Sequence, residues 1–271
     1  MDSKQVAALF REKGYIELRG FFSPQEVESV LRAMRDAKQC ERGRGRLNDN
    51  GLLFNHDLYF HNPDIQKFIS QQKIVDVLVP LAGPDIWIHW DQLVTKQPGG
   101  VEFPWHQDNG YNGLKNEHFQ FWIALSESKP ANGGIWLSPG SHKKGILPHA
   151  WVGKHKVYQR KVKNEVAISA SAGDALIFSS LLLHRTKPNV SNITRHSYVI
   201  EYMSVKHYDP HLTPPYFIVA KNGKSAPRFE KTYEGQRNPF SRFKYPGFML
   251  QDAKSSLRRM ASGTLRTTGF E

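Results

Sequence analysis

The chain has 271 residues and a mass of 31.0 kDa, enough for one large domain, and 39% of its residues are apolar. A buried core is therefore expected, and wholesale disorder is excluded. The single cysteine, Cys40, excludes an internal disulfide framework and zinc sites built from several thiolates. It also fits a reducing compartment such as the cytoplasm.

The net charge of +12 raises the question of an acidic partner. Basic residues gather in 154–163 and in 221–271, but these stretches contain little of the aromatic interleaving typical of single-strand binding grooves. We therefore expect a solvated basic surface and no nucleic-acid partner. The N-terminus has no secretory signal pattern, and no run approaches the roughly 20 apolar residues of a membrane span. No membrane partner is expected.

The first forty residues predict two helices and a strand. Apolar residues recur at helical spacing in 3–13, and the segment "YIEL" (15–18) alternates like a strand. Ser23, followed by a proline and by Glu26, has the pattern of a capping box with proline at the first helical position. A helix over about 24–38 is therefore predicted.

The rest of the chain predicts strands. A polar, glycine-broken loop is expected over 41–51, and 52–63 is expected to form a loop over the barrel mouth. Six β-rich runs then follow, separated by Gly, Pro and Asn turns: 85–96, 118–127, 133–139, 164–170, 173–184 and 194–205. They predict a mostly β fold with flanking helices, built on a jelly-roll or barrel core. The basic tail after 206 is expected to be extended, with a short helix near 251–260.

Three His-x-Asp pairs occur among the 12 histidines. Residues i and i+2 of a strand point the same way, so such a pair can offer two ligands to one metal ion. A non-haem iron centre needs a further histidine from a neighbouring strand. His207 and Asp209 fail this test, because only His211 follows them. His89 and Asp91 lie in the middle of a predicted strand, where side chains usually pack.

The third pair, His106 and Asp108, lies where a predicted strand meets a loop, in "WHQDNGY". His184 ends the apolar run "GDALIFSSLLLH" and can supply the third ligand. Thr186 follows two residues later, and Arg195 lies on the next predicted strand. A buried arginine suits the far carboxylate of a 2-oxo acid, because its guanidinium can bind both oxygens.

These segments together resemble a known family. "WHQD", "FWIALSESKPANGGIWLSPGSH", "GDALIFSSLLLH", "TRHSYVIEY" and the opening "LFREKGYIELRGFFSPQEVESVL" are similar to the phytanoyl-CoA dioxygenase (PhyH) family of Fe(II)/2-oxoglutarate oxygenases. The resemblance covers about residues 5–205 and implies a double-stranded β-helix, cupin-like core. The chain is expected to form one oxygenase domain, 1–271, in which 206–271 is a basic, proline-containing extension.

The resemblance also implies roles for individual residues. His106, Asp108 and His184 would bind Fe(II), and Arg195 would bind the C5 carboxylate of 2-oxoglutarate with help from Thr186. Oxidation would consume O2 and release succinate and CO2. Because related halogenases carry a small residue in place of the carboxylate, Asp108 favours hydroxylation or another oxidation over halogenation.

Two further positions, Gln92 and Trp122, match cosubstrate contacts of the family. If Gln92 faces the site, alternation along the strand turns His89 and Asp91 the other way. A substrate lining is expected from aromatic and polar residues near the motif: Phe54, His56, Trp90, Asn109 and Tyr111. A small, polar, ring-containing molecule fits these side chains better than a long acyl chain, as for a tailoring hydroxylase of specialised metabolism.

Four alternatives remain open at this point. A nucleic-acid demethylase would carry a second arginine after Arg195, and "RHSYVIEYMSV" has none. An acyl-CoA or other acidic-metabolite hydroxylase would share the same chemistry. A non-catalytic cupin-like binding protein would not need all four site residues, and a jelly-roll enzyme that uses no 2-oxo acid would leave Arg195 without a role. A monomer or a homodimer is expected.

Overall fold

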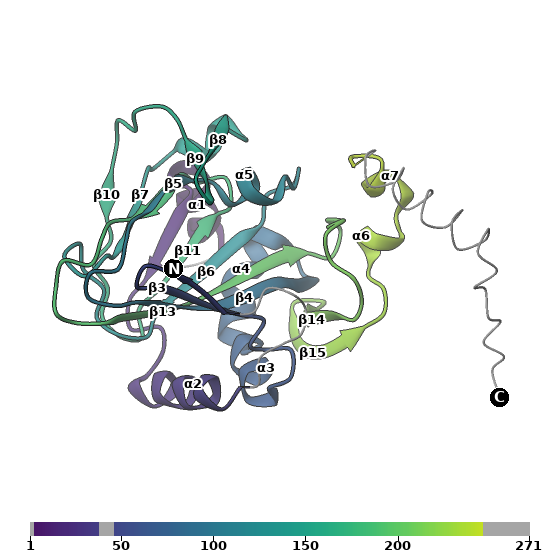
Figure 1. Cartoon of the computed structure of the whole chain (residues 1–271). Coiled ribbons are helices and arrows are strands. Elements are labelled where there is room, and N and C mark those ends of the chain that lie inside the picture. The colour runs from purple at the N-terminus through teal and green to yellow at the C-terminus, as the bar shows by residue number, and fades with distance from the viewer. Residues whose placement is uncertain (1–2, 38–45, 246–271) are drawn as a thin grey trace, which may run out of the picture.

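The computed structural model describes residues 3–37 and 46–245. Two β-sheets face each other, and helices cover the outer side of the larger one (Figure 1). The larger sheet has the order β1 (Tyr15–Leu18), β11 (Ala175–Ser179), β6 (Phe119–Ala124), β13 (Arg195–Ser204), β4 (Ile86–Lys96), β14 (Tyr216–Lys221) and β15 (Lys224–Glu230), and β3 (Leu52–His56) and β2 (Arg46–Asp49) join it through β4.

The smaller sheet has the order β10 (Val166–Ala167), β7 (Ile135–Leu137), β12 (His184–Thr186) and β5 (Phe103–His106). A separate hairpin is formed by β8 (His149–Val152) and β9 (His155–Tyr158). The antiparallel pairing confirms the prediction of a mostly β chain with flanking helices and a jelly-roll core.

Four helices pack on the outer face of the larger sheet: α1 (Ser3–Lys13), α2 (Pro24–Asp36), α3 (Pro63–Ile69) and α4 (Gln72–Ala82). Their apolar sides, such as Val30 and Leu78, form one core with the outward residues Phe121 and Ile200 of the sheet. The predicted capping box of α2 is present, because Glu26 N donates to Ser23 Oγ over 3.2 Å and Ser23 N donates to the Glu26 carboxylate.

The prediction of loops over 46–56 is wrong. Arg46–Asp49 and Leu52–His56 form the hairpin β2–β3, and β3 pairs with the second half of β4. Asn50 and Gly51 both have positive φ, as a two-residue hairpin turn requires. The strand alternation then turns Phe54 and His56 toward the space between the sheets, where they line a cavity.

The tail after 206 contains a second unpredicted hairpin. β14 pairs with the first residues of β4, and Asn222 and Gly223 at positive φ connect it to β15. The short helices α6 (Glu234–Arg237) and α7 (Pro239–Arg242) follow, and Figure 1 shows this part of the chain at one edge of the molecule. The helix expected near 251–260 lies outside the described residues.

A bulge in β4 decides which residues face the interior. Opposite β13, Trp90 pairs with Glu201 and Ile88 pairs with Tyr202, so His89 is an extra residue. Asp91 faces the helices, where it accepts hydrogen bonds from Tyr198 Oη and from the backbone of Tyr59. His89 instead lines the cavity. The predicted outward orientation is therefore right for Asp91 and wrong for His89, because the bulge breaks the alternation.

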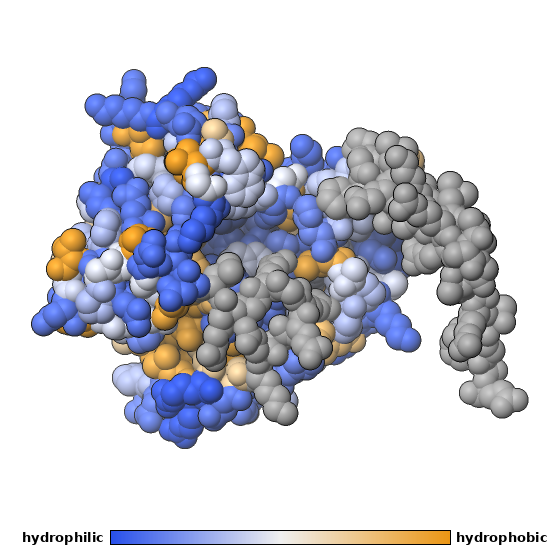
Figure 2. All heavy atoms as spheres, in the orientation of Figure 1, coloured by the Kyte–Doolittle hydropathy of each residue, from blue (hydrophilic) through white to orange (hydrophobic). Residues whose placement is uncertain are grey.

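The face in Figure 2 is mostly hydrophilic, with small separate apolar patches. Of the helices in 3–37 and 46–245, none is both long and apolar enough to cross a membrane.

Candidate active site

A cavity of about 570 Å³ lies between the two sheets, a volume typical of small-molecule sites. The structure brings eleven of the twelve predicted site residues to it: Phe54, His56, Trp90, Gln92, His106, Asp108, Tyr111, Trp122, His184, Thr186 and Arg195. Asn109 is the exception.

Three of these side chains form a compact group. His106 ends β5, Asp108 begins the short helix α5 (Asp108–Asn112), and His184 begins β12, which pairs with β5 directly at His106. Asp108 Oδ1 lies 3.8 Å from His106 Nε2 and 3.7 Å from His184 Nε2. One ligand atom from each residue lies within 4.8 Å of the others, so the group can hold a metal ion.

The two histidines are oriented for this task. His106 Nδ1 lies 2.8 Å from the carbonyl oxygen of Pro104, and His184 Nδ1 lies 2.9 Å from that of Leu182. A ring nitrogen facing a carbonyl must carry the proton, which leaves each Nε2 with a free lone pair toward the centre of the group. Burial and the neighbouring His184 hold the pKa of His106 well below its usual range, so its ring stays neutral. The donor set of two imidazoles and one carboxylate is the one that non-haem Fe(II) oxygenases use, and it leaves the remaining positions open.

Arg195 lies at the deep end of the cavity and is 1% exposed. Its Nη1 donates to Ser197 Oγ over 2.7 Å, whereas its Nε and Nη2 have no hydrogen-bond partner among the described residues. Burial lowers the pKa of Arg195 to about 10, which still leaves it charged at neutral pH. A buried cation with open donors requires an anion, and the far carboxylate of 2-oxoglutarate fits this requirement.

A second buried basic residue, Lys96, was not predicted. It is the cross-strand partner of Arg195, and its Nζ donates to Thr186 Oγ1 and to the carbonyl oxygen of Lys187, each over 2.7 Å. Burial and the charge of Arg195 lower the pKa of Lys96 to about 7. The sequence offered one signal for Lys96, because this lysine ends the predicted strand 85–96, which pairs with the strand of Arg195. Thr186 is thus held by Lys96 while lining the cavity.

Aromatic side chains form another part of the lining, which we call the wide end. His56 and Trp90 meet edge to face with centroids 6.0 Å apart, and Phe54 stacks against His56 at 6.1 Å. Tyr111 lies edge to face with His106 at 5.5 Å, and its hydroxyl accepts a hydrogen bond from Lys156 N. These rings offer an apolar wall to the body of a substrate.

The structure does not bring Asn109 to the cavity. Its Nδ2 donates to the carbonyl oxygens of Leu114 and Asn116, so this amide closes the turn after α5. Asn112, one helical turn later, lines the cavity instead. The sequence pattern did not distinguish the two amides, because both lie beside the same motif.

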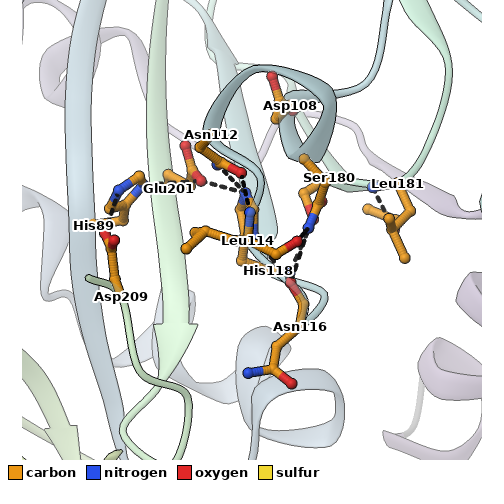
Figure 3. A network of polar contacts seen from close by, with 12 residues as sticks. His89, Asp108, Asn112, Leu114, Asn116, His118, Ser180, Leu181, Glu201 and Asp209 are labelled. Carbon is orange, nitrogen blue, oxygen red and sulfur yellow. Dashed lines mark hydrogen bonds and ion pairs between the residues drawn. The ribbon is translucent and has the colours of Figure 1, made fainter. Parts of the chain in front are cut away.

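A buried group of acids and histidines stands beside the metal-ligating group (Figure 3). Glu201 contacts His89 Nδ1 over 3.0 Å and also contacts His118 Nε2. His89 Nε2 lies 2.6 Å from Asp209 Oδ2. All four side chains are at most 4% exposed. The histidine of one rejected His-x-Asp pair, His89, therefore contacts the aspartate of the other, Asp209.

The charges of this group stabilise one another. Burial alone would raise the pKa of Glu201, but His118 and His89 outweigh it and hold that pKa well below its usual range. Burial alone would lower the pKa of His89, but Asp209 and Glu201 raise it to about 9. Glu201 is therefore ionised and His89 is a cation at neutral pH.

Fold and site together define a class: a jelly-roll oxygenase with a two-histidine, one-carboxylate metal group and a buried arginine for a 2-oxo acid. The family model "Phytanoyl-CoA dioxygenase (PhyH)" matches residues 10–197, so the chain belongs to the PhyH family. It is an Fe(II)/2-oxoglutarate-dependent dioxygenase.

Relatives support this assignment. A probable alpha-ketoglutarate-dependent hypophosphite dioxygenase of Stutzerimonas stutzeri is 28% identical over 71% of this chain and 76% of its own. A methylphosphonate hydroxylase of Gimesia maris is 28% identical over 74% and 80%. The solved epimerase SnoN in complex with Fe3+, alpha ketoglutarate and nogalamycin RO is similar in fold, with a TM-score of 0.64 and 19% identity over 85% of this chain and 97% of SnoN.

Proposed function

We propose that the protein hydroxylates an unactivated C–H bond of a small polar molecule, with release of succinate and CO2, and that it tailors a natural product. The observation that carries the proposal is the cavity itself. One volume holds the His106, Asp108 and His184 group, the open donors of Arg195 and an aromatic wall. A carboxylate at position 108 favours hydroxylation over halogenation, because it leaves no space for a halide ligand.

The residues divide the work along the cavity. His106, Asp108 and His184 would hold Fe(II), which activates O2 at the expense of 2-oxoglutarate. Arg195 and Thr186 would bind the C5 carboxylate of 2-oxoglutarate, and Gln92 and Trp122 would line its chain. The aromatic wall would place the substrate and exclude water, so that the oxidising step is directed at one C–H bond.

A second candidate is hydroxylation of an acidic metabolite. It is favoured by the relatives that act on hypophosphite and methylphosphonate, both of which are phosphorus oxyanions. A long acyl-CoA fits less well, because the cavity is of small-molecule size and its wide end is lined by rings. Family membership and the complete set of site residues argue against a non-catalytic binding protein.

We also propose that the protein works in the cytoplasm as a monomer or homodimer, as one oxygenase domain, on a small molecule and not on nucleic acid. The single cysteine supports the cytoplasm, and the lack of a second arginine in "RHSYVIEYMSV" after Arg195 argues against a nucleic-acid substrate.

Anaerobic titration tests the proposed function. The protein with Fe(II) and 2-oxoglutarate should develop a metal-to-ligand charge-transfer band, and His106→Ala should abolish both the band and all succinate release. The control is His142→Ala, which changes a histidine whose ring contacts the backbone carbonyl of Arg11. It should retain both the band and succinate release. Absence of the band in the unaltered protein would contradict the proposal.

A further inference from the structure

The starting observation is a carboxylate oxygen without a partner. Glu201 is fully buried on β13 and lines the cavity. Its Oε1 contacts both His89 and His118, whereas its Oε2 has no hydrogen-bond partner among the described residues. Leaving a buried charged atom unpaired is unfavourable, so this oxygen is poised to accept a hydrogen bond from a ligand.

The position of Glu201 suits a substrate contact. Its cross-strand partner on β6 is Gln120, which is buried and lines the same cavity, and on its other side lies Trp90 of the aromatic wall. Along β13, Val199, Ser197 and Arg195 also line the cavity, at every second residue. Glu201 therefore lies six residues from the cation that would bind 2-oxoglutarate, toward the other end of the same strand.

The remaining charges of the cavity decide the kind of ligand. Three residues of its lining carry Lys or Arg side chains: Lys154, Arg185 and Arg195. Lys154 is paired with Asp49 and Arg185 with Glu165, at 2.5 and 2.6 Å. Arg195 is the one that would bind the cosubstrate. An oxyanion substrate would thus find no unpaired Lys or Arg in this lining and would face the carboxylate of Glu201, whose like charge would repel it.

We propose that the substrate presents a hydrogen-bond donor, either a hydroxyl or a protonated amine, to Glu201, and that this residue excludes oxyanion substrates. The inference rests on the proposed function and names the substrate class of the same site. His89, His118 and Asp209 hold the carboxylate in place and fix which oxygen is open (Figure 3). The rings of His56 and Trp90 would receive the apolar part of the same molecule.

Three ring-bearing probes of similar size test the inference: 2-phenylethanol, 2-phenylethylamine and phenylacetate. Each is titrated anaerobically into the protein loaded with Fe(II) and 2-oxoglutarate, and its Kd is read from the change in the charge-transfer band. We expect the alcohol or the amine to bind at least about tenfold more tightly than phenylacetate.

The variant Glu201→Gln separates the two donors. It keeps an acceptor oxygen but removes the charge, so binding of the amine should weaken by about tenfold or more, whereas binding of the alcohol should change by less than about threefold. Glu127→Gln is the control, because it removes the same charge from an exposed carboxylate that pairs with Lys129. It should leave all three Kd values unchanged.

Several outcomes overturn the inference. It is wrong if phenylacetate binds as tightly as both donors, if neither donor binds, or if Glu201→Gln leaves the binding of both donors unchanged. If Glu201→Gln does not fold, the order of the three probes on the unaltered protein decides alone. A normal charge-transfer band without the expected order contradicts only this inference, whereas absence of the band contradicts the proposed function itself.

Discussion

The two ends of the cavity solve opposite electrostatic problems. At the deep end, the basic residues Arg195 and Lys96 are cross-strand partners, and the guanidinium keeps open donors. At the wide end, the anions Glu201 and Asp209 are held apart by a histidine cation. At the first end, the donors of Arg195 have no partner until an anion binds. At the second, histidines already contact the carboxylates, and Glu201 Oε2 is left to accept a hydrogen bond. One strand, β13, thus presents a site for a di-acid and a site for a donor.

Removing the cation of the deep end should give the largest effect. We expect Arg195→Met to raise the Kd of 2-oxoglutarate at least about thirtyfold, because truncating one partner of a buried charge pair costs about 2–5 kcal/mol. The Kd of Arg195→Lys should lie between those of the unaltered protein and Arg195→Met, since lysine keeps the charge but cannot form the bidentate contact. The Kd is measured from the charge-transfer band. Arg185→Met is the control and should leave this Kd unchanged. An equal rise in the Kd for Arg185→Met would contradict the assignment of Arg195 as the residue that binds 2-oxoglutarate.

At the wide end, the expected effect is on stability. His89→Gln leaves two buried carboxylates without their shared cation, so we expect the free energy of unfolding to fall by about 3 kcal/mol at pH 7. The pKa of His89 is raised to about 9 from an ordinary value of 6.5. Its contribution is therefore fully present below pH 6.5 and is lost as the pH rises through 9.

Urea denaturation at pH 7.0 and pH 9.5 measures both parts of this prediction. The unaltered protein should lose more stability than His89→Gln over that interval. His142→Gln, in the turn η1 (Ser141–Lys144), should follow the unaltered protein. Identical pH dependence in His89→Gln and the unaltered protein would show that His89 is not the shared cation.

The smallest expected effect concerns Lys96. Its pKa is lowered to about 7, and a bound di-acid beside it should raise that pKa, so that 2-oxoglutarate binding takes up a proton above pH 7. Affinity for 2-oxoglutarate should then fall by up to about tenfold per pH unit between pH 7 and pH 8.5. In Lys96→Met this dependence should become flatter. Lys187→Met serves as the control, since the Lys187 side chain lies over the Trp136 ring and only its backbone contacts Lys96.

The sequence predicted those features that depend on order and strand alternation. His106 and Asp108 at a strand end, His184 after an apolar run and Arg195 in an alternating strand all reach one cavity. Ser23 and Glu26 were sufficient to predict the start of α2, because capping is a local interaction.

The features that were not predicted depend on long-range pairing. The bulge at His89 arises from the register between β4 and β13, which no local pattern of β4 reveals. The two hairpins did have a local signal, the Asn-Gly turns at 50–51 and 222–223, but the polar and basic residues around them favoured a loop. Glu201 looked like an ordinary residue of "VIEY", since its partners His89 and His118 come from two distant segments.

Asp209 follows the segment that matches the family, 10–197, yet it reaches the interior through His89. His106, Asp108 and His184, which are proposed to bind iron, and Arg195 all lie within that segment. A change after β13 that moves Asp209 would therefore act on Glu201 through His89, and so on the proposed substrate contact, without altering the residues proposed to bind iron and 2-oxoglutarate.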